Sequence, residues 1–137
     1  MGATSGPLMA REETGSQTLP MFMTMAPYDM WSYDLNQDDT MTTQAVDMWL
    51  VRNGLADASN VVEVRKTGAT ETYVEGRYNN SVWENEDGIP LFRYAWVTGK
   101  DHVNLPAENQ LLWDEWFSQI TLDTETGVRA YQGQAIG

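Results

Sequence analysis

The chain has 137 residues, of which 42% are apolar and six are tryptophan, and its formal net charge is −12. This length allows one domain, and the apolar content is sufficient for a folded core. The strong negative charge argues against nucleic acid as a partner, because phosphate binding needs clustered Lys and Arg, and equally against an anionic membrane surface. Without a single cysteine, the chain has no disulfide, no thiolate nucleophile and no zinc–thiolate site.

The first part of the chain is predicted to be a loop followed by a buried strand. Residues 1–19 are rich in Gly, Ser and Thr, which is typical of a loop or linker. No basic-then-apolar leader opens the chain, so we expect no signal peptide in it. Residues 21–25 (MFMTM) form a short apolar run. Such a run is typical of a strand that is buried on both faces, as in a parallel sheet.

A helix and a hairpin are predicted next. Residues 38–55 have the apolar spacing of a helix, with Asp39 or Thr40 as its cap and Asn53-Gly54 as its end. Residues 60–81 then alternate between apolar and polar side chains and contain a Thr-Gly pair where a turn is needed. This pattern predicts an antiparallel hairpin.

The last part of the chain is predicted to form a strong strand, a helix and a short final strand. Residues 89–99 (IPLFRYAWVTG) are rich in aromatic and β-branched residues, with Pro near the start and Gly at the end. Residues 104–120 have the apolar stripe of an amphipathic helix. Residues 128–131 fit a short strand.

This order of elements predicts a fold of the α/β class. Two buried strands separated by a helix suggest a parallel sheet that is covered by helices. Two such strands are too few to bury their own side chains on both faces. We therefore expect residues 20–137 to be the C-terminal part of a larger α/β domain, with two core strands, two main helices and an inserted hairpin.

The chain's one histidine, His102, lies in a short segment between the strand predicted at 89–99 and the following helix. Asp29 follows the other buried strand in the same way. In α/β-hydrolases the catalytic residues run Ser, then Asp or Glu, then His along the chain, and Asp29 and His102 fit this order. A lone histidine before a helix is more often an exposed polar residue, so the spacing alone leaves both interpretations open.

Several stretches, taken in order, resemble the polyhydroxybutyrate-depolymerase-like and feruloyl or acetylxylan esterases of carbohydrate esterase family 1. They are ATSGPL, PMFMTMAPYDMWSYDL, AVDMWLVRNGL, GIPLFRYAWVTGKDHVNLPAENQLLWDEWFSQI and LDTETGVRAYQG. The resemblance implies the C-terminal portion of an α/β-hydrolase sheet, with His102 as general base and acid. It makes Asp29 the orienting acid, with Asp34, Asp38 and Asp39 as alternates. The chain departs from the family at Ala26, where Gly is common, and after His102, where many members have Trp-Pro.

The nucleophile of such a triad is missing from this sequence. No G-x-S-x-G motif is present, and the serine of GATSG, Ser5, stands one place too late and follows no strand. The resemblance therefore implies a fragment of a serine carboxylic-ester hydrolase that is inactive alone. Its parent is expected to act, without a cofactor, on a small-molecule ester or on acyl esters of plant polysaccharides. The N-terminal half of the domain becomes a partner if it is a separate chain, and the resemblance is compatible with a secreted parent.

Other functions are compatible with parts of the sequence. Trp31 and Trp83 stand among polar residues, where they could line a substrate pocket or belong to the core. This leaves a non-catalytic, aromatic-rich carbohydrate-binding module, or a catalytically dead assembly protein, as alternatives. Asp34, Asn36 and Asp38 have the spacing that opens a calcium loop, but the Gly and Glu that such a loop needs further on are absent, so we expect no metal.

Overall fold

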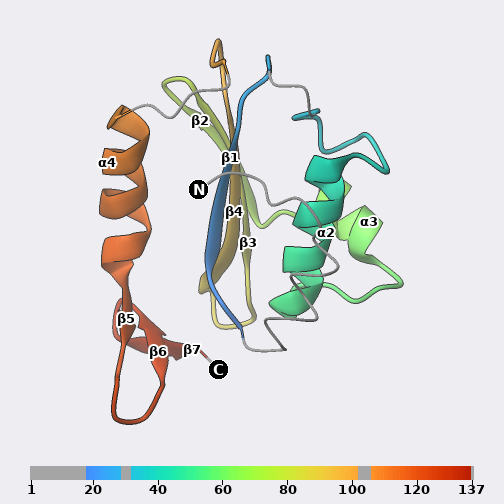
Figure 1. Cartoon of the computed structure of the whole chain (residues 1–137). Coiled ribbons are helices and arrows are strands. Elements are labelled where there is room, and N and C mark those ends of the chain that lie inside the picture. Colours follow the sequence, from blue (N-terminus) through green and yellow to red (C-terminus); the bar gives the residue numbers. More distant parts are fainter. Residues whose placement is uncertain (1–17, 29–31, 102–105, 137) are drawn as a thin grey trace. The chain divides into compact units, whose positions relative to one another are not determined.

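The computed structural model describes residues 18–28, 32–101 and 106–136 (Figure 1). The chain divides into two compact units, Met1–His102 and Val103–Gly137, and each is described by itself. The loop or linker predicted for residues 1–19 lies almost wholly outside the described residues.

The first unit contains a four-stranded mixed sheet with the strand order β1-β4-β3-β2. Its strands are β1 (Met21–Met25), β2 (Glu71–Glu75), β3 (Tyr78–Glu84) and β4 (Pro90–Val97). Strands β1 and β4 are parallel neighbours, with Met21 opposite Phe92 and Met25 opposite Trp96. Strands β2, β3 and β4 pair in antiparallel fashion. The two strands predicted from their apolar runs are therefore adjacent and parallel.

Helices α2 (Met41–Arg52) and α3 (Val61–Thr67) lie on one face of this sheet (Figure 1). Helix α2 begins at the predicted cap Thr40, whose hydroxyl accepts the backbone N–H of Thr43 at 3.0 Å. The Thr43 hydroxyl accepts the backbone N–H of Thr40 in return, at 3.1 Å. This reciprocal arrangement satisfies two donors that a helix start otherwise leaves unpaired.

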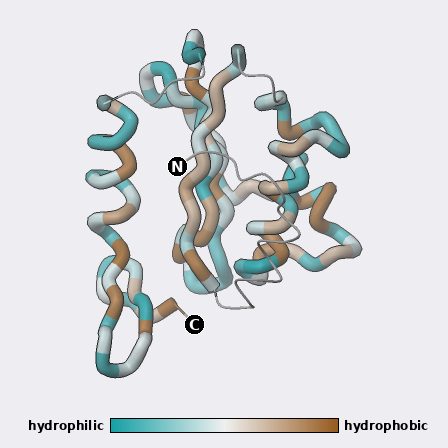
Figure 2. The backbone as a smooth tube through the Cα atoms, viewed as in Figure 1, coloured by the Kyte–Doolittle hydropathy of each residue, from teal (hydrophilic) through white to brown (hydrophobic). Residues whose placement is uncertain are grey.

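The core lies between α2 and the face of the sheet that carries every second residue of β1 and β4. Successive side chains of a strand point to opposite faces, so Met21, Met23 and Met25 share a face with their partners Phe92 and Tyr94. These side chains pack in one cluster with buried residues of α2, among them Ala45, Val46 and Leu50. Figure 2 shows the apolar stretches of β1 and β4 side by side.

The second unit contains one α-helix and a small antiparallel sheet. Helix α4 (Pro106–Glu115) is followed by the short 3-10 helix η1 (Phe117–Gln119). Strands β5 (Ile120–Leu122), β6 (Arg129–Tyr131) and β7 (Gln134–Ile136) then form a three-stranded meander. The final strand predicted at 128–131 corresponds to β6.

The prediction of the C-terminal portion of an α/β-hydrolase sheet is wrong. The described residues form seven strands in two sheets, one mixed and one antiparallel, with three short α-helices. The predicted hairpin is an integral part of the main sheet, because β3 pairs directly with β4. Its first arm was also misplaced, since residues 61–67 form α3: Val61, Val64 and Arg65 follow the i, i+3, i+4 spacing of a helix.

Candidate functional site

The candidate site lies at the edge of the main sheet where β1 and β4 both end. Because the two strands are parallel neighbours, their carboxyl ends meet at the same edge, with Met25 opposite Trp96. Asp29 follows Tyr28 directly, and His102 follows Asp101. Both predicted triad residues, Asp29 and His102, lie outside the described residues, and their side chains are not placed.

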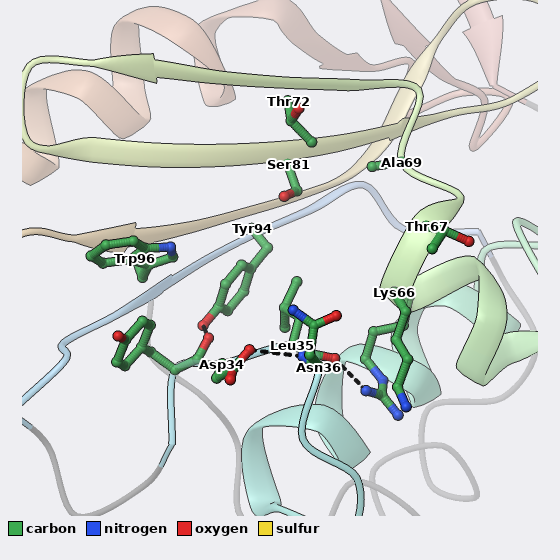
Figure 3. A pocket seen from close by; sticks show the side chains of 12 residues that line it. Asp34, Leu35, Asn36, Lys66, Thr67, Ala69, Thr72, Ser81, Tyr94 and Trp96 are labelled. Carbon is green, nitrogen blue, oxygen red and sulfur yellow. Dashed lines mark hydrogen bonds between the residues drawn. The ribbon is translucent and has the colours of Figure 1, made fainter.

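A cavity of about 580 Å³ lies on the helix-covered face near this edge. It is lined by the loop 33–36, the end of α3, the hairpin and β4 (Figure 3). Figure 3 shows Thr72 and Ser81 of the hairpin on one side and Asp34 of the loop on the other, with Tyr94 and Trp96 between them. Such a mixture of aromatic and polar groups is typical of a small-molecule site.

The aromatic wall of the cavity is held in place from two parts of the chain. The rings of Tyr33 and Trp96 are in contact, with centroids 4.7 Å apart and planes inclined by 44°. The hydroxyl of Tyr94 donates a hydrogen bond to the backbone carbonyl of Tyr33 at 2.6 Å. Burial raises the pKa of Tyr94, and the nearby negative charge of Asp34 raises it further. Tyr94 therefore stays protonated and keeps the loop fixed to β4.

Among the alternates for the triad acid, Asp34 lies in the wall of the cavity. Its Oδ1 accepts the backbone N–H of Asn36 at 2.9 Å, a local bond that shapes the loop. A carboxylate oxygen has several lone pairs, so this bond leaves Asp34 able to accept more donors.

The carboxylate of Asp38, in contrast, forms ion pairs with two cationic side chains. Its Oδ1 lies 2.9 Å from Nη2 of Arg65, and its Oδ2 lies 3.1 Å from Nζ of Lys66. The hydrogen bond from Arg65, and then that from Lys66, hold the pKa of Asp38 below its ordinary value. Both oxygens thus serve an ion-pair network, which makes Asp38 a structural residue and a weaker candidate for orienting a histidine.

Arg65 on α3 connects the loop that contains Leu35 and Gln37 to helix α2. Its Nε lies 2.8 Å from Oδ1 of Asp47 on α2, and Nη1 donates to the backbone carbonyls of Leu35 and Gln37. The Arg65 side chain is 1% exposed. The guanidinium therefore joins α3, α2 and the loop through charge-assisted bonds.

Of the two tryptophans predicted to line a substrate pocket, Trp83 belongs to the core and Trp31 lies outside the described residues. Trp83 is 2% exposed, and its indole N–H donates to the backbone carbonyl of Val64 at 3.0 Å. Its ring lies 5.5 Å from that of Phe92. The assignment of Trp83 to substrate binding is therefore corrected: its side chain is buried against α3, although most of the residues around it in the sequence are polar.

The described residues show neither a metal-binding cluster nor a membrane-spanning helix. Within residues 18–28, 32–101 and 106–136, no group of three or more His, Cys, Asp or Glu side chains is placed to hold a metal ion. In the same ranges no helix has both the length and the apolar content to cross a membrane.

The aromatic part of the cavity was not predicted from the sequence. Tyr33, Tyr94 and Trp96 were not among the predicted site residues. A signal was available in β4, where Tyr94 and Trp96 stand two residues apart and so share a face. Nothing in the sequence indicated that the loop at Tyr33 returns to that face.

No protein family, curated protein or solved structure was found to match this chain.

Proposed function

We propose that this chain supplies the histidine and the acid of a Ser-His-Asp triad in a carboxylic-ester hydrolase. One observation carries the proposal. Strands β1 and β4 are parallel neighbours, so both strands end at the same edge of the sheet, a few residues before Asp29 and His102 in the sequence. We propose that the two side chains meet at this edge, which the order of residues along the chain does not by itself require.

The roles follow from the chemistry of ester cleavage. His102 takes the proton of a serine hydroxyl as that oxygen attacks the ester, and then passes it to the leaving alcohol. The acid fixes the tautomer of the imidazole and stabilises its charged form. Asp29 is the proposed acid. Asp34 is the alternate, since it lies in the cavity wall, whereas Asp38 already holds Arg65 and Lys66.

The cavity supports this proposal by providing a place for part of the substrate. Its aromatic wall of Tyr33 and Trp96 can contact an apolar or planar group, while Thr72 and Ser81 offer hydroxyls for hydrogen bonds. A small-molecule ester or an acyl ester of a plant polysaccharide, as the resemblance to carbohydrate esterase family 1 implies, fits this mixture.

The nucleophile is proposed to lie outside this sequence. This sequence has no G-x-S-x-G motif that could form a nucleophile elbow. The alternative function, a non-catalytic carbohydrate-binding module, has less support. One of the two tryptophans on which it rested, Trp83, is buried in the core.

We expect the isolated chain to hydrolyse an aryl acetate no faster than its His102→Ala variant. Both the serine and the donors that stabilise the oxyanion are proposed to lie elsewhere, so the histidine has no nucleophile to activate. Release of the phenol from both proteins, each checked for folding by circular dichroism, measures this. A clear rate that depends on His102 would contradict the proposal that the nucleophile lies outside the chain.

A further inference from the structure

The end of helix α2 is joined to the main sheet by one buried side-chain amide, that of Asn53. Its Oδ1 accepts the backbone N–H of Leu19 at 3.0 Å, just before β1 begins. Its Nδ2 donates to the backbone carbonyl of Leu19 and to that of Leu91 in β4, each at 2.9 Å. Asn53 is 4% exposed. Three hydrogen bonds from one amide thus connect α2, β1 and β4 at the start of the parallel pair.

The residue after Asn53 makes this amide chemically vulnerable. Asn53-Gly54 is the one Asn-Gly pair in the sequence. In such a pair the backbone nitrogen of Gly54 can attack Cγ of Asn53, forming a C–N bond and expelling ammonia. Water then opens the resulting succinimide to give aspartate or isoaspartate. Glycine favours the attack because it has no side chain to hinder its nitrogen and leaves the backbone free to rotate.

The folded structure opposes this reaction at each point. The Gly54 N–H donates to the carbonyl of Val51 at 3.1 Å, so the attacking nitrogen is engaged. The backbone of Asn53 has ψ of 7°, fixed by its position at the end of α2. The side chain is held away by its bonds to Leu19 and Leu91. All these interactions must break together before the nitrogen can reach Cγ.

The aspartate or isoaspartate formed at position 53 cannot make the hydrogen bonds that the Asn53 amide made. Aspartate has no N–H to donate, so its second oxygen faces the carbonyl oxygens of Leu19 and Leu91. It also carries a charge into a buried position, which is unfavourable without a paired cation. Isoaspartate additionally lengthens the backbone at the helix end. The junction can therefore not re-form as it was.

From this geometry we propose that Asn53 is a conformation-gated deamidation site. Deamidation is slow while α2, β1 and β4 are joined and fast once the junction opens, and it then makes the opening irreversible. The reaction needs no reagent other than water.

The test compares the rate of deamidation at Asn53 in the folded chain and in the same chain in concentrated urea, at mildly alkaline pH. Peptide mapping by mass spectrometry follows the conversion of the amide to the acid. The buried Asn80, followed by Ser81, serves as an internal comparison. We expect at least tenfold slower conversion of Asn53 in the folded chain. Each tenfold corresponds to about 1.4 kcal/mol of opening free energy. Equal rates in both conditions would overturn the proposal.

A second measurement tests irreversibility. The deamidated fraction from the urea sample, separated by its extra negative charge, is refolded beside unmodified chain that has been through the same treatment. We expect it to lack the cooperative melt of the control, as the Asn53→Asp variant also should. If the deamidated fraction melts at the same temperature as the control, the proposal that deamidation makes the opening irreversible is wrong, whatever the deamidation rates in the folded and unfolded chain. The Gly54→Ala variant, also in urea, is expected to deamidate more slowly, which identifies the attacking nitrogen.

Discussion

The Arg65→Met variant is expected to lose about 3 kcal/mol of unfolding free energy, at the lower end of the range for breaking a buried ion pair. Its guanidinium is buried and bonds both Asp38 and Asp47. Methionine fills a similar volume but leaves Asp47 without its cation and the carbonyls of Leu35 and Gln37 without their donor. We choose the lower end because Asp38 is 52% exposed and can be rehydrated.

Urea unfolding of wild type, Arg65→Met and Arg65→Lys measures this effect. Lysine keeps the positive charge but lacks the planar guanidinium whose several N–H groups reach separate acceptors. The unfolding free energy of Arg65→Lys should therefore lie between those of the other two proteins. Because the pKa of Asp38 is lowered in the fold, its contribution is present above the unfolded value of 3.8 and is lost as the pH falls further. The difference in unfolding free energy between wild type and Arg65→Met should therefore become smaller at acidic pH. Equal stability of these two proteins near neutral pH would contradict the account.

The Trp83→Ala variant is expected to lose about 3–5 kcal/mol of unfolding free energy, as is usual for removing a large buried aromatic side chain. Trp83 packs against Phe92 between the sheet and α3, and its indole N–H is bonded to the carbonyl of Val64. Alanine removes both the packing and the donor. The variant leaves a space that the surrounding strands cannot fill completely.

Trp83→Phe is the matched control for this variant. Phenylalanine keeps most of the packing and loses one hydrogen bond to the Val64 carbonyl, which still accepts the backbone N–H of Gly68 at 2.9 Å. The expected loss is therefore only about 0.5–1.5 kcal/mol, the net contribution of one typical hydrogen bond. Thermal and urea unfolding, both followed by circular dichroism, give the comparison. If Trp83→Ala is as stable as wild type, Trp83 is not part of the core, and its prediction as a ligand-binding residue has to be reconsidered.

The elements that could be predicted from sequence were those in which one pattern dominates. The run of residues 21–25 is apolar throughout and forms β1, and Thr40 caps α2 as expected. The strand predicted for residues 61–67 was wrong because the valines of this segment fit both a strand and a helix. The buried pair Val61 and Arg65 shows that the helical spacing prevails. Trp83 was uncertain for a related reason, since its polar neighbours on β3 do not reveal which face it occupies.

The candidate site was less predictable than the strands that support it. Its aromatic wall depends on a contact between Tyr33 and β4, and the hydrogen bond between Tyr94 and Tyr33 joins residues 61 positions apart. No local pattern encodes such a contact. The fold class was wrong for a similar reason: the pairing of β3 with β4 makes the hairpin part of the main sheet, and pairing between distant segments is decided by tertiary packing.

The central claim, that His102 pairs with an acid at the edge where β1 and β4 end, can be tested directly because the chain has one histidine. Its imidazole can be followed by NMR through a pH titration without ambiguity of assignment. We expect its pKa to lie above the value of a free histidine, about 6.5, because a neighbouring carboxylate favours the charged form. Asp29→Asn should lower it by about one unit, whereas Asp38→Asn should leave it unchanged. A fall in Asp34→Asn instead would transfer the role of acid to Asp34. The claim would be contradicted if the pKa of His102 equals that of a free histidine and none of the three Asp→Asn variants changes it.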